Sequence, residues 1–91
     1  MLFGIDYDGT LAVDPDLFSE LIFNIRNTGY ERDGVHQCIL VTQRSDENGW
    51  GDEVRRTMHN AGINIPIVFA SGQSKAEAAA KAGYYPDVWI D

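Results

Sequence analysis

Four short apolar runs, each continuous rather than alternating with polar residues, constrain this chain most strongly. They are Leu2–Ile5, Cys38–Val41, Ile65–Ala70 and Val88–Ile90. Continuous runs of this length are typical of strands buried on both faces, as in a parallel sheet. Helical patterns fill the intervals between the runs. The resulting order, in which four strands alternate with three helices, predicts an α/β domain with helices on both faces of a parallel sheet.

Three helices are predicted between these strands. The first begins at Pro15 with Asp14 as its N-cap, and the third begins with the capping box Ser74–Glu77. Glycines end the second and third helices, at Gly62 and Gly83. The apolar stripes recur at three- or four-residue spacing: Leu17, Phe18, Leu21, Ile22 and Ile25 in the first helix, and Val54, Met58 and Ala61 in the second. Loops are expected over Gly29–Gln37 and Ser45–Gly51.

Length and charge limit the classes of function. The 91 residues suit one domain spanning positions 1–91, with no linker or repeat. Fourteen acidic against seven basic residues give a net charge of -7, which disfavours strong non-specific binding to nucleic acid or to an anionic membrane. No apolar run approaches the roughly 20 residues of a membrane span, and no signal-type segment follows Met1, so we expect a cytoplasmic protein. A single cysteine excludes an intrachain disulfide framework. The oligomeric state stays open.

Polar residues follow the predicted strands at the edge where ligands of open α/β sheets bind. Asp6 and Asp8 flank the end of the first strand, and two acids so close need a cation, for which Mg²⁺ is the best candidate. Thr42 follows the second strand and offers a hydroxyl. Lys75 opens the third helix and offers a positive charge. A hydroxyl and an ammonium at a helix N-terminus are suited to binding phosphate.

This constellation resembles the haloacid dehalogenase superfamily of phosphohydrolases. The family's first motif, Asp-x-Asp-Gly-Thr-Leu, matches Asp6–Leu11 in full. Its second, an apolar strand ending in Thr or Ser, matches Ile39–Thr42. Its third and fourth, a Lys opening a helix and an acid ending the next strand, fit Lys75 and Asp91. The resemblance spans the whole chain. The first motif is highly specific, and the others gain weight from their order.

The resemblance implies a Mg²⁺-dependent phosphatase that forms an aspartyl-phosphate. Asp6 resembles the nucleophile and Asp8 the general acid. Thr42 and Lys75 resemble the groups that hold the substrate phosphate. The Asp6 carboxylate, the Asp8 backbone carbonyl and Asp91 resemble the Mg²⁺ ligands. Since Asp91 must then lie beside Asp6, the resemblance implies a three-layer, Rossmann-like domain with strand order 4-1-2-3.

Two departures from the family's pattern bear on activity and substrate. The family usually has a second acid after the fourth motif and a further strand, whereas this chain stops at Asp91 and is expected to lack that C-terminal strand. Neither Leu11–Asp14 nor Ser71–Ser74 is long enough to hold a cap domain, so the site should be open. An open site suits a substrate that closes it, such as a polynucleotide end or a phosphoprotein, and a small phosphorylated molecule is a third class. The alternative function is a catalytically weak or inactive acidic binding module on the same fold.

Several residues allow two interpretations. Arg44 lies two positions after Thr42 and either contacts the substrate phosphate or forms a loop ion pair with Asp46 or Glu47. Trp50, between two glycines, either stacks on a substrate or folds back onto the core. Three further residues are expected to be structural: His36 and His59 on the surface, and Cys38 in the core. The acids Asp46, Glu47, Asp52 and Glu53 are expected to form a solvated face at a helix N-terminus.

Overall fold

A computed structural model describes residues 1–28 and 35–91 as an α/β fold built on a four-stranded parallel sheet. The strands are β1 (Leu2–Asp6), β2 (Gln37–Thr42), β3 (Ile67–Phe69) and β4 (Val88–Ile90). Their order is β3-β2-β1-β4. All three neighbouring pairs are parallel. Because a sheet can be read from either edge, each strand has the neighbours that the expected order 4-1-2-3 gives it. Because β4 pairs with β1, Asp91, which follows β4, comes close to Asp6 at the end of β1.

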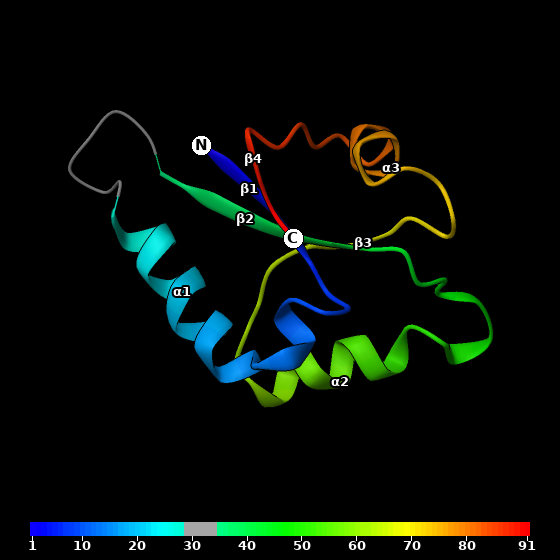
Figure 1. Cartoon of the computed structure of the whole chain (residues 1–91), viewed down its shortest axis with the longest axis horizontal. Coiled ribbons are helices and arrows are strands. Elements are labelled where there is room, and N and C mark those ends of the chain that lie inside the picture. Colours follow the sequence, from blue (N-terminus) through cyan, green and yellow to red (C-terminus); the bar gives the residue numbers. More distant parts are fainter. Residues whose placement is uncertain (29–34) are drawn as a thin grey trace.

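Three helices cover the sheet: α1 (Pro15–Thr28), α2 (Asp52–Asn60) and α3 (Lys75–Lys81). Two short 3-10 turns, η1 (Leu11–Val13) and η2 (Glu47–Gly49), precede α1 and α2. Helices α1 and α2 lie on one side of the sheet and α3 lies on the other (Figure 1). Among the described residues, no helix combines the length and the apolar character that crossing a membrane requires.

The core divides into two clusters because successive residues of β2 point to opposite faces. One cluster joins Leu40 and Ile5 to Ile22 of α1 and to Val54 and Met58 of α2. The other joins Ile39, Val41 and Val68 to two small residues of α3, Ala78 and Ala79. The continuous apolar run of β2 is therefore buried on both faces, as the sequence pattern indicates.

Both predicted N-caps are confirmed. The Asp14 carboxylate accepts a hydrogen bond from the Leu17 backbone N–H at 3.1 Å. The Ser74 hydroxyl accepts one from the Glu77 backbone N–H at the same distance. Gly62 and Gly83, which follow α2 and α3, have φ of +72° and +89°, the left-handed conformation that ends a helix. The starts of α1 and α3 and the ends of α2 and α3 therefore follow from capping chemistry that is visible in the sequence.

The predicted stripe of α1 is partly wrong. Leu17 is 56% exposed and Leu21 is also exposed, whereas Ile22 is buried. Phe18 and Ile25 pack against the core with Ile22. These three residues lie at i, i+4 and i+7 and so share one face of the helix. Leu21 directly precedes Ile22 and therefore points about 100° away from this face. The helix is apolar over a wider arc than the sheet covers.

Strand β3 is shorter than the expected run Ile65–Ala70. Its pairing with β2 begins where the Pro66 carbonyl accepts a hydrogen bond from the Leu40 N–H at 2.9 Å, and Pro66 itself has no N–H to donate. Of the expected loop Gly29–Gln37, positions 29–34 lie outside the described residues, and Gln37 begins β2. The loop expected over Ser45–Gly51 contains the turn η2.

Candidate active site

Asp6, Lys75 and Asp91 meet where β1 and β4 end. The Lys75 ammonium lies 2.9 Å from the Asp6 Oδ1 and 3.1 Å from the Asp91 Oδ1. Two carboxylates therefore share one cation, and their bonded oxygens can be no further apart than the sum of those two distances. The side chains of Asp6 and Lys75 are only 16% and 23% exposed, whereas that of Asp91 is 66% exposed. Asp91 is thus the most solvated member of the group.

The loop between β3 and α3 delivers Lys75 to this position. Ser71 and Gly72 both have positive φ, +51° and +85°, which turns the chain back towards the sheet. Lys75 then opens α3 directly after its cap, Ser74. A cation in the first helical turn opposes the helix dipole. The two carboxylates compensate for that unfavourable placement.

Burial and the two carboxylates have opposite effects on the pKa of Lys75. Desolvation acts to lower the pKa of its ammonium. Hydrogen bonds and Coulombic attraction to Asp6 and Asp91 outweigh it, so the pKa of Lys75 lies above its usual value of 10.5. The side chain therefore keeps its full positive charge at neutral pH.

Asp8 has a different cation, Arg44. The guanidinium donates from Nη2 to the Asp8 Oδ1 at 2.9 Å and from Nε to Oδ2 at 3.2 Å, a two-pronged arrangement. Its Nη1 donates to the Glu53 Oε2 at 3.1 Å, and its centre lies 5.1 Å from the centre of the Tyr7 ring. The hydrogen bond to Asp8, with a smaller contribution from Glu53, raises the pKa of Arg44 above its usual range. Asp6 and Asp8 therefore pair with different cations of the protein, Asp6 with Lys75 and Asp8 with Arg44.

The prediction that Arg44 forms an ion pair with Asp46 or Glu47 is wrong, because its partners are Asp8 and Glu53. Asp46 forms an ion pair with Arg55 instead. The hydrogen bond from Arg55 lowers the pKa of Asp46. The observed partner Glu53 was expected to lie on a solvated face, and only its position in the first turn of α2, close to the end of β2, could have indicated the contact.

Thr42 and Tyr7 are buried beneath these charged groups. The Thr42 Oγ1 accepts a hydrogen bond from the Arg44 backbone N–H at 3.2 Å, and its own hydroxyl proton can still be donated. The Tyr7 hydroxyl donates to the Thr57 Oγ1 of α2 at 2.9 Å. Sequence reasoning missed Tyr7, which occupies the variable position of the first motif. Its ring supports Arg44 and its hydroxyl ties the β1 turn to α2.

The donor set is of the right kind for Mg²⁺. Asp6 and Asp91 contribute hard carboxylate oxygens that lie near one another, and the expected third ligand is a backbone carbonyl, that of Asp8. Within residues 1–28 and 35–91, no three side chains of His, Cys, Asp or Glu group as a metal site. The expected set contains only two such side chains. The carboxylate oxygens of these two side chains are the ligand type that hard divalent cations prefer.

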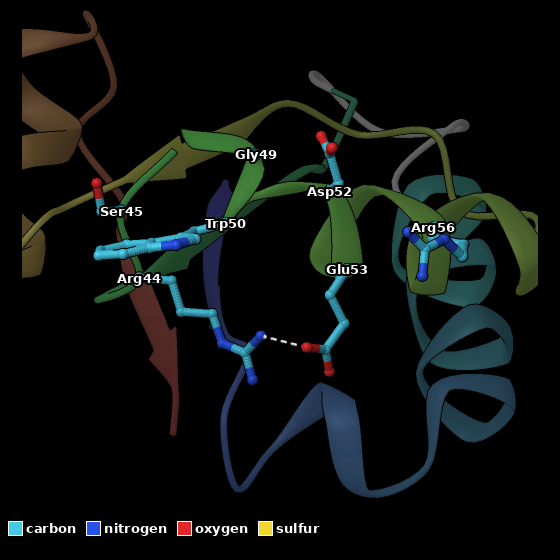
Figure 2. A pocket seen from close by; sticks show the side chains of 7 residues that line it. All are labelled: Arg44, Ser45, Gly49, Trp50, Asp52, Glu53 and Arg56. Carbon is cyan, nitrogen blue, oxygen red and sulfur yellow. Dashed lines mark hydrogen bonds and ion pairs between the residues drawn. The ribbon is translucent and has the colours of Figure 1, made fainter. Parts of the chain in front are cut away.

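A pocket of about 540 Å³ is lined in part by Arg44, the partner of Asp8, and Figure 2 shows its lining residues. It lies between the loop after β2 and the start of α2, and its lining consists of Arg44, Ser45, Gly49, Trp50, Asp52, Glu53 and Arg56. Trp50 is 63% exposed, so it does not fold back onto the core. Figure 2 shows Trp50 and Ser45 on one side of the pocket and the side chains of α2 on the other.

The remaining expectations concern residues outside the site. Cys38 is buried in the core, as expected, and burial raises the pKa of its thiol. His59 is exposed, and His36 is partly buried beside the chain's amino group. Comparison of the chain with known protein families, curated proteins and solved structures finds no match.

Proposed function

We propose that this protein is a Mg²⁺-dependent phosphohydrolase that acts through an aspartyl-phosphate on Asp6, with the three-layer, Rossmann-like fold of haloacid dehalogenase-like enzymes. The observation that carries the proposal is the shared contact of Lys75 with Asp6 and Asp91. These residues come from the first, third and fourth sequence motifs. Their convergence at the carboxyl edge of a parallel sheet supports a common site.

In the proposed reaction, an Asp6 carboxylate oxygen attacks the phosphorus of a phosphomonoester. The bond between phosphorus and the leaving-group oxygen breaks, and Asp8 donates a proton to that oxygen. Asp8 then accepts a proton from a water molecule, whose oxygen attacks the phosphorus. The bond between phosphorus and Asp6 breaks, which yields inorganic phosphate and restores both carboxyl groups to their starting states.

Lys75 and Thr42 hold the phosphoryl group in this proposal. The ammonium neutralises negative charge on its oxygens. Thr42 is fully buried, so its hydroxyl can donate a hydrogen bond to the phosphoryl group only after the residues that cover it shift. The Asp6 carboxylate, the Asp8 backbone carbonyl and Asp91 would hold Mg²⁺. When bound, Mg²⁺ supplies positive charge that offsets the charge of the phosphoryl oxygens.

Arg44 has two tasks in the proposal. Its two-pronged contact occupies both oxygens of Asp8, so the guanidinium has to release at least one of them before Asp8 can hold the proton that it donates. Its Nη1 is bonded to the exposed acid Glu53, so a phosphate can compete for the guanidinium at little cost. Arg44 is therefore assigned to substrate binding, and its turn towards the phosphate frees Asp8 for proton transfer.

The proposed substrate is a phosphorylated small molecule, a polynucleotide end or a phosphoprotein. The net charge of -7 weighs against the polynucleotide, whose backbone would be repelled. The proposed location is the cytoplasm.

A second candidate is an inactive binding module, and one observation favours it. Both cations of the site are already paired with its own acids, Lys75 with Asp6 and Asp91, and Arg44 with Asp8 and Glu53. Such a site can persist as a static ion-pair network.

Phosphatase assays with and without millimolar Mg²⁺ separate the two candidates. We expect Mg²⁺-dependent phosphate release that falls at least about 10³-fold in Asp6→Asn. The matched control is Asp16→Asn, an exposed aspartate in the first turn of α1, which should keep full activity. The melting temperature should also rise when Mg²⁺ and beryllofluoride are added together. No phosphate release and no rise in melting temperature would favour the binding module.

A further inference from the structure

We propose that the pocket beside Arg44 is the leaving-group site of this enzyme and that it accepts a leaving group carrying a planar ring, which stacks on Trp50. The inference rests on the proposed phosphohydrolase activity and specifies its substrate class. The ring can belong to an aryl phosphate or to the base of a nucleotide. Both present the same π face to an indole.

The exposure of Trp50 is imposed by an anchored loop. Asn48 and Gly49, which precede it, both have positive φ, +54° and +78°. Gly51, which follows it, is buried, and a Cβ at that position would overlap the Asp46 carboxylate and lie 2.8 Å from the Phe69 ring. A large aromatic side chain that is 63% exposed on a loop fixed in this way is presented to the pocket rather than to the core.

Arg55 of α2 also holds the loop that carries Trp50. Arg55 of α2 forms an ion pair with Asp46, directly before η2, and its guanidinium lies 5.1 Å from the centre of the Phe69 ring. The backbone on either side of Trp50 is therefore held in place before any ligand arrives, which reduces the conformational freedom that the loop loses when a ring stacks on the indole.

Arg44 joins the pocket to the proposed reaction centre. The same guanidinium lines the pocket and holds Asp8, the residue that would protonate the leaving-group oxygen. A phosphomonoester bound with its phosphorus at Asp6 must direct its leaving group towards Asp8. The pocket with Trp50 is adjacent to that point.

The charges and size of the pocket suit an uncharged ring. Its lining has two cations, Arg44 and Arg56, and two acids, Asp52 and Glu53, so it is formally neutral in a protein of net charge -7. Its volume of about 540 Å³ lies in the range of small-molecule sites. A phenyl ring or a base can therefore enter without burying an uncompensated charge.

The test compares three phosphomonoesters: phenyl phosphate, a nucleoside 5′-monophosphate and glycerol phosphate. We expect Trp50→Ala to lower kcat/KM about 5- to 30-fold for a ring-bearing ester, the effect of losing one stacked ring. For glycerol phosphate the change should stay below about 2-fold. Trp50→Phe should restore most of the loss. Tyr85→Ala, at another exposed aromatic residue, should have no effect.

Each outcome is decisive. Hydrolysis by the wild type with an equal loss for all three esters in Trp50→Ala, or with no loss for any, overturns the ring-binding site while the phosphohydrolase proposal stands. Absence of Mg²⁺-dependent hydrolysis of all three esters by the wild type overturns the proposed function and the inference with it. A loss confined to one of the two ring-bearing esters supports the site and identifies the source of the ring.

Discussion

The ion pair between Lys75 and Asp6 should contribute measurably to the stability of the fold, and a double-mutant cycle isolates its contribution. The cycle uses Lys75→Met, Asp6→Asn and the double variant. Methionine keeps the length and apolar stem of lysine while removing the charge. A second cycle replaces Asp6→Asn by Asp91→Asn, because the same ammonium contacts both carboxylates.

Solvent exposure sets the magnitudes. Exposed ion pairs contribute about 0.2–1 kcal/mol, whereas breaking a fully buried pair costs about 3–5 kcal/mol. Lys75 and Asp6 are 23% and 16% exposed, so their coupling should lie between these limits, at about 1–2 kcal/mol. Asp91 is 66% exposed, so its coupling to Lys75 should not exceed about 0.5 kcal/mol.

Urea unfolding followed by circular dichroism measures these free energies. In a domain of this size, 1 kcal/mol corresponds to a change of roughly 4–8 °C in melting temperature, which gives an independent check. Lys81→Met, in the last turn of the same helix, is the control and should cost at most a few tenths of a kcal/mol, about the value of a helix-dipole contact. A coupling of Lys75 to Asp91 equal to or larger than its coupling to Asp6 would refute the reasoning from exposure.

Three further outcomes are expected. Because folding raises the pKa of Lys75, the stability that its charge contributes is complete below pH 10.5, the usual pKa, and is lost as pH rises through the higher folded value. The difference in melting temperature between wild type and Lys75→Met should therefore shrink only above pH 10.5. A decrease in this difference near neutral pH would contradict the prediction. Tyr7→Phe removes the hydrogen bond to Thr57 and should cost about 0.5–1.5 kcal/mol in urea unfolding, whereas an unchanged midpoint would show that water replaces it. Gly51→Ala places a methyl group against the Asp46 carboxylate and the Phe69 ring and should cost about 1–3 kcal/mol; a melting temperature equal to that of the wild type would mean that the loop adjusts freely.

The fold could be predicted where a local signal and burial agree. The run Cys38–Val41 is apolar throughout, and the strand that contains it is buried on both faces. The caps Asp14 and Ser74 place the starts of α1 and α3 because a side-chain oxygen satisfies a free N–H there. The face of α1 could not be predicted, since the helix is apolar over a wide arc and the sheet covers only part of it. Tertiary packing decides between Leu21 and Ile22.

The site could be predicted at the level of elements but not of ion pairs. Strand ends of a parallel sheet meet at one edge, so Asp6, Thr42 and Asp91 were expected to gather there. Which acid takes which cation depends on side-chain reach and on the path of loops. Arg44 reaches back to Asp8 and forward to Glu53, while its sequence neighbour Asp46 is taken by Arg55. Sequence proximity favoured the wrong partner.

The charge balance of the site bears on how a phosphate can enter it. Before Asp8 takes up the proton that it later donates, the site has two cations, Lys75 and Arg44, and four carboxylates, so it carries two net negative charges. The carboxylates are those of Asp6, Asp8, Glu53 and Asp91. A phosphomonoester dianion would be repelled by this arrangement at close range. One divalent cation restores neutrality. Under the proposed function, phosphate analogues should therefore bind more weakly without Mg²⁺ than with it, because Lys75 and Arg44 both have carboxylate partners with which the analogue must compete.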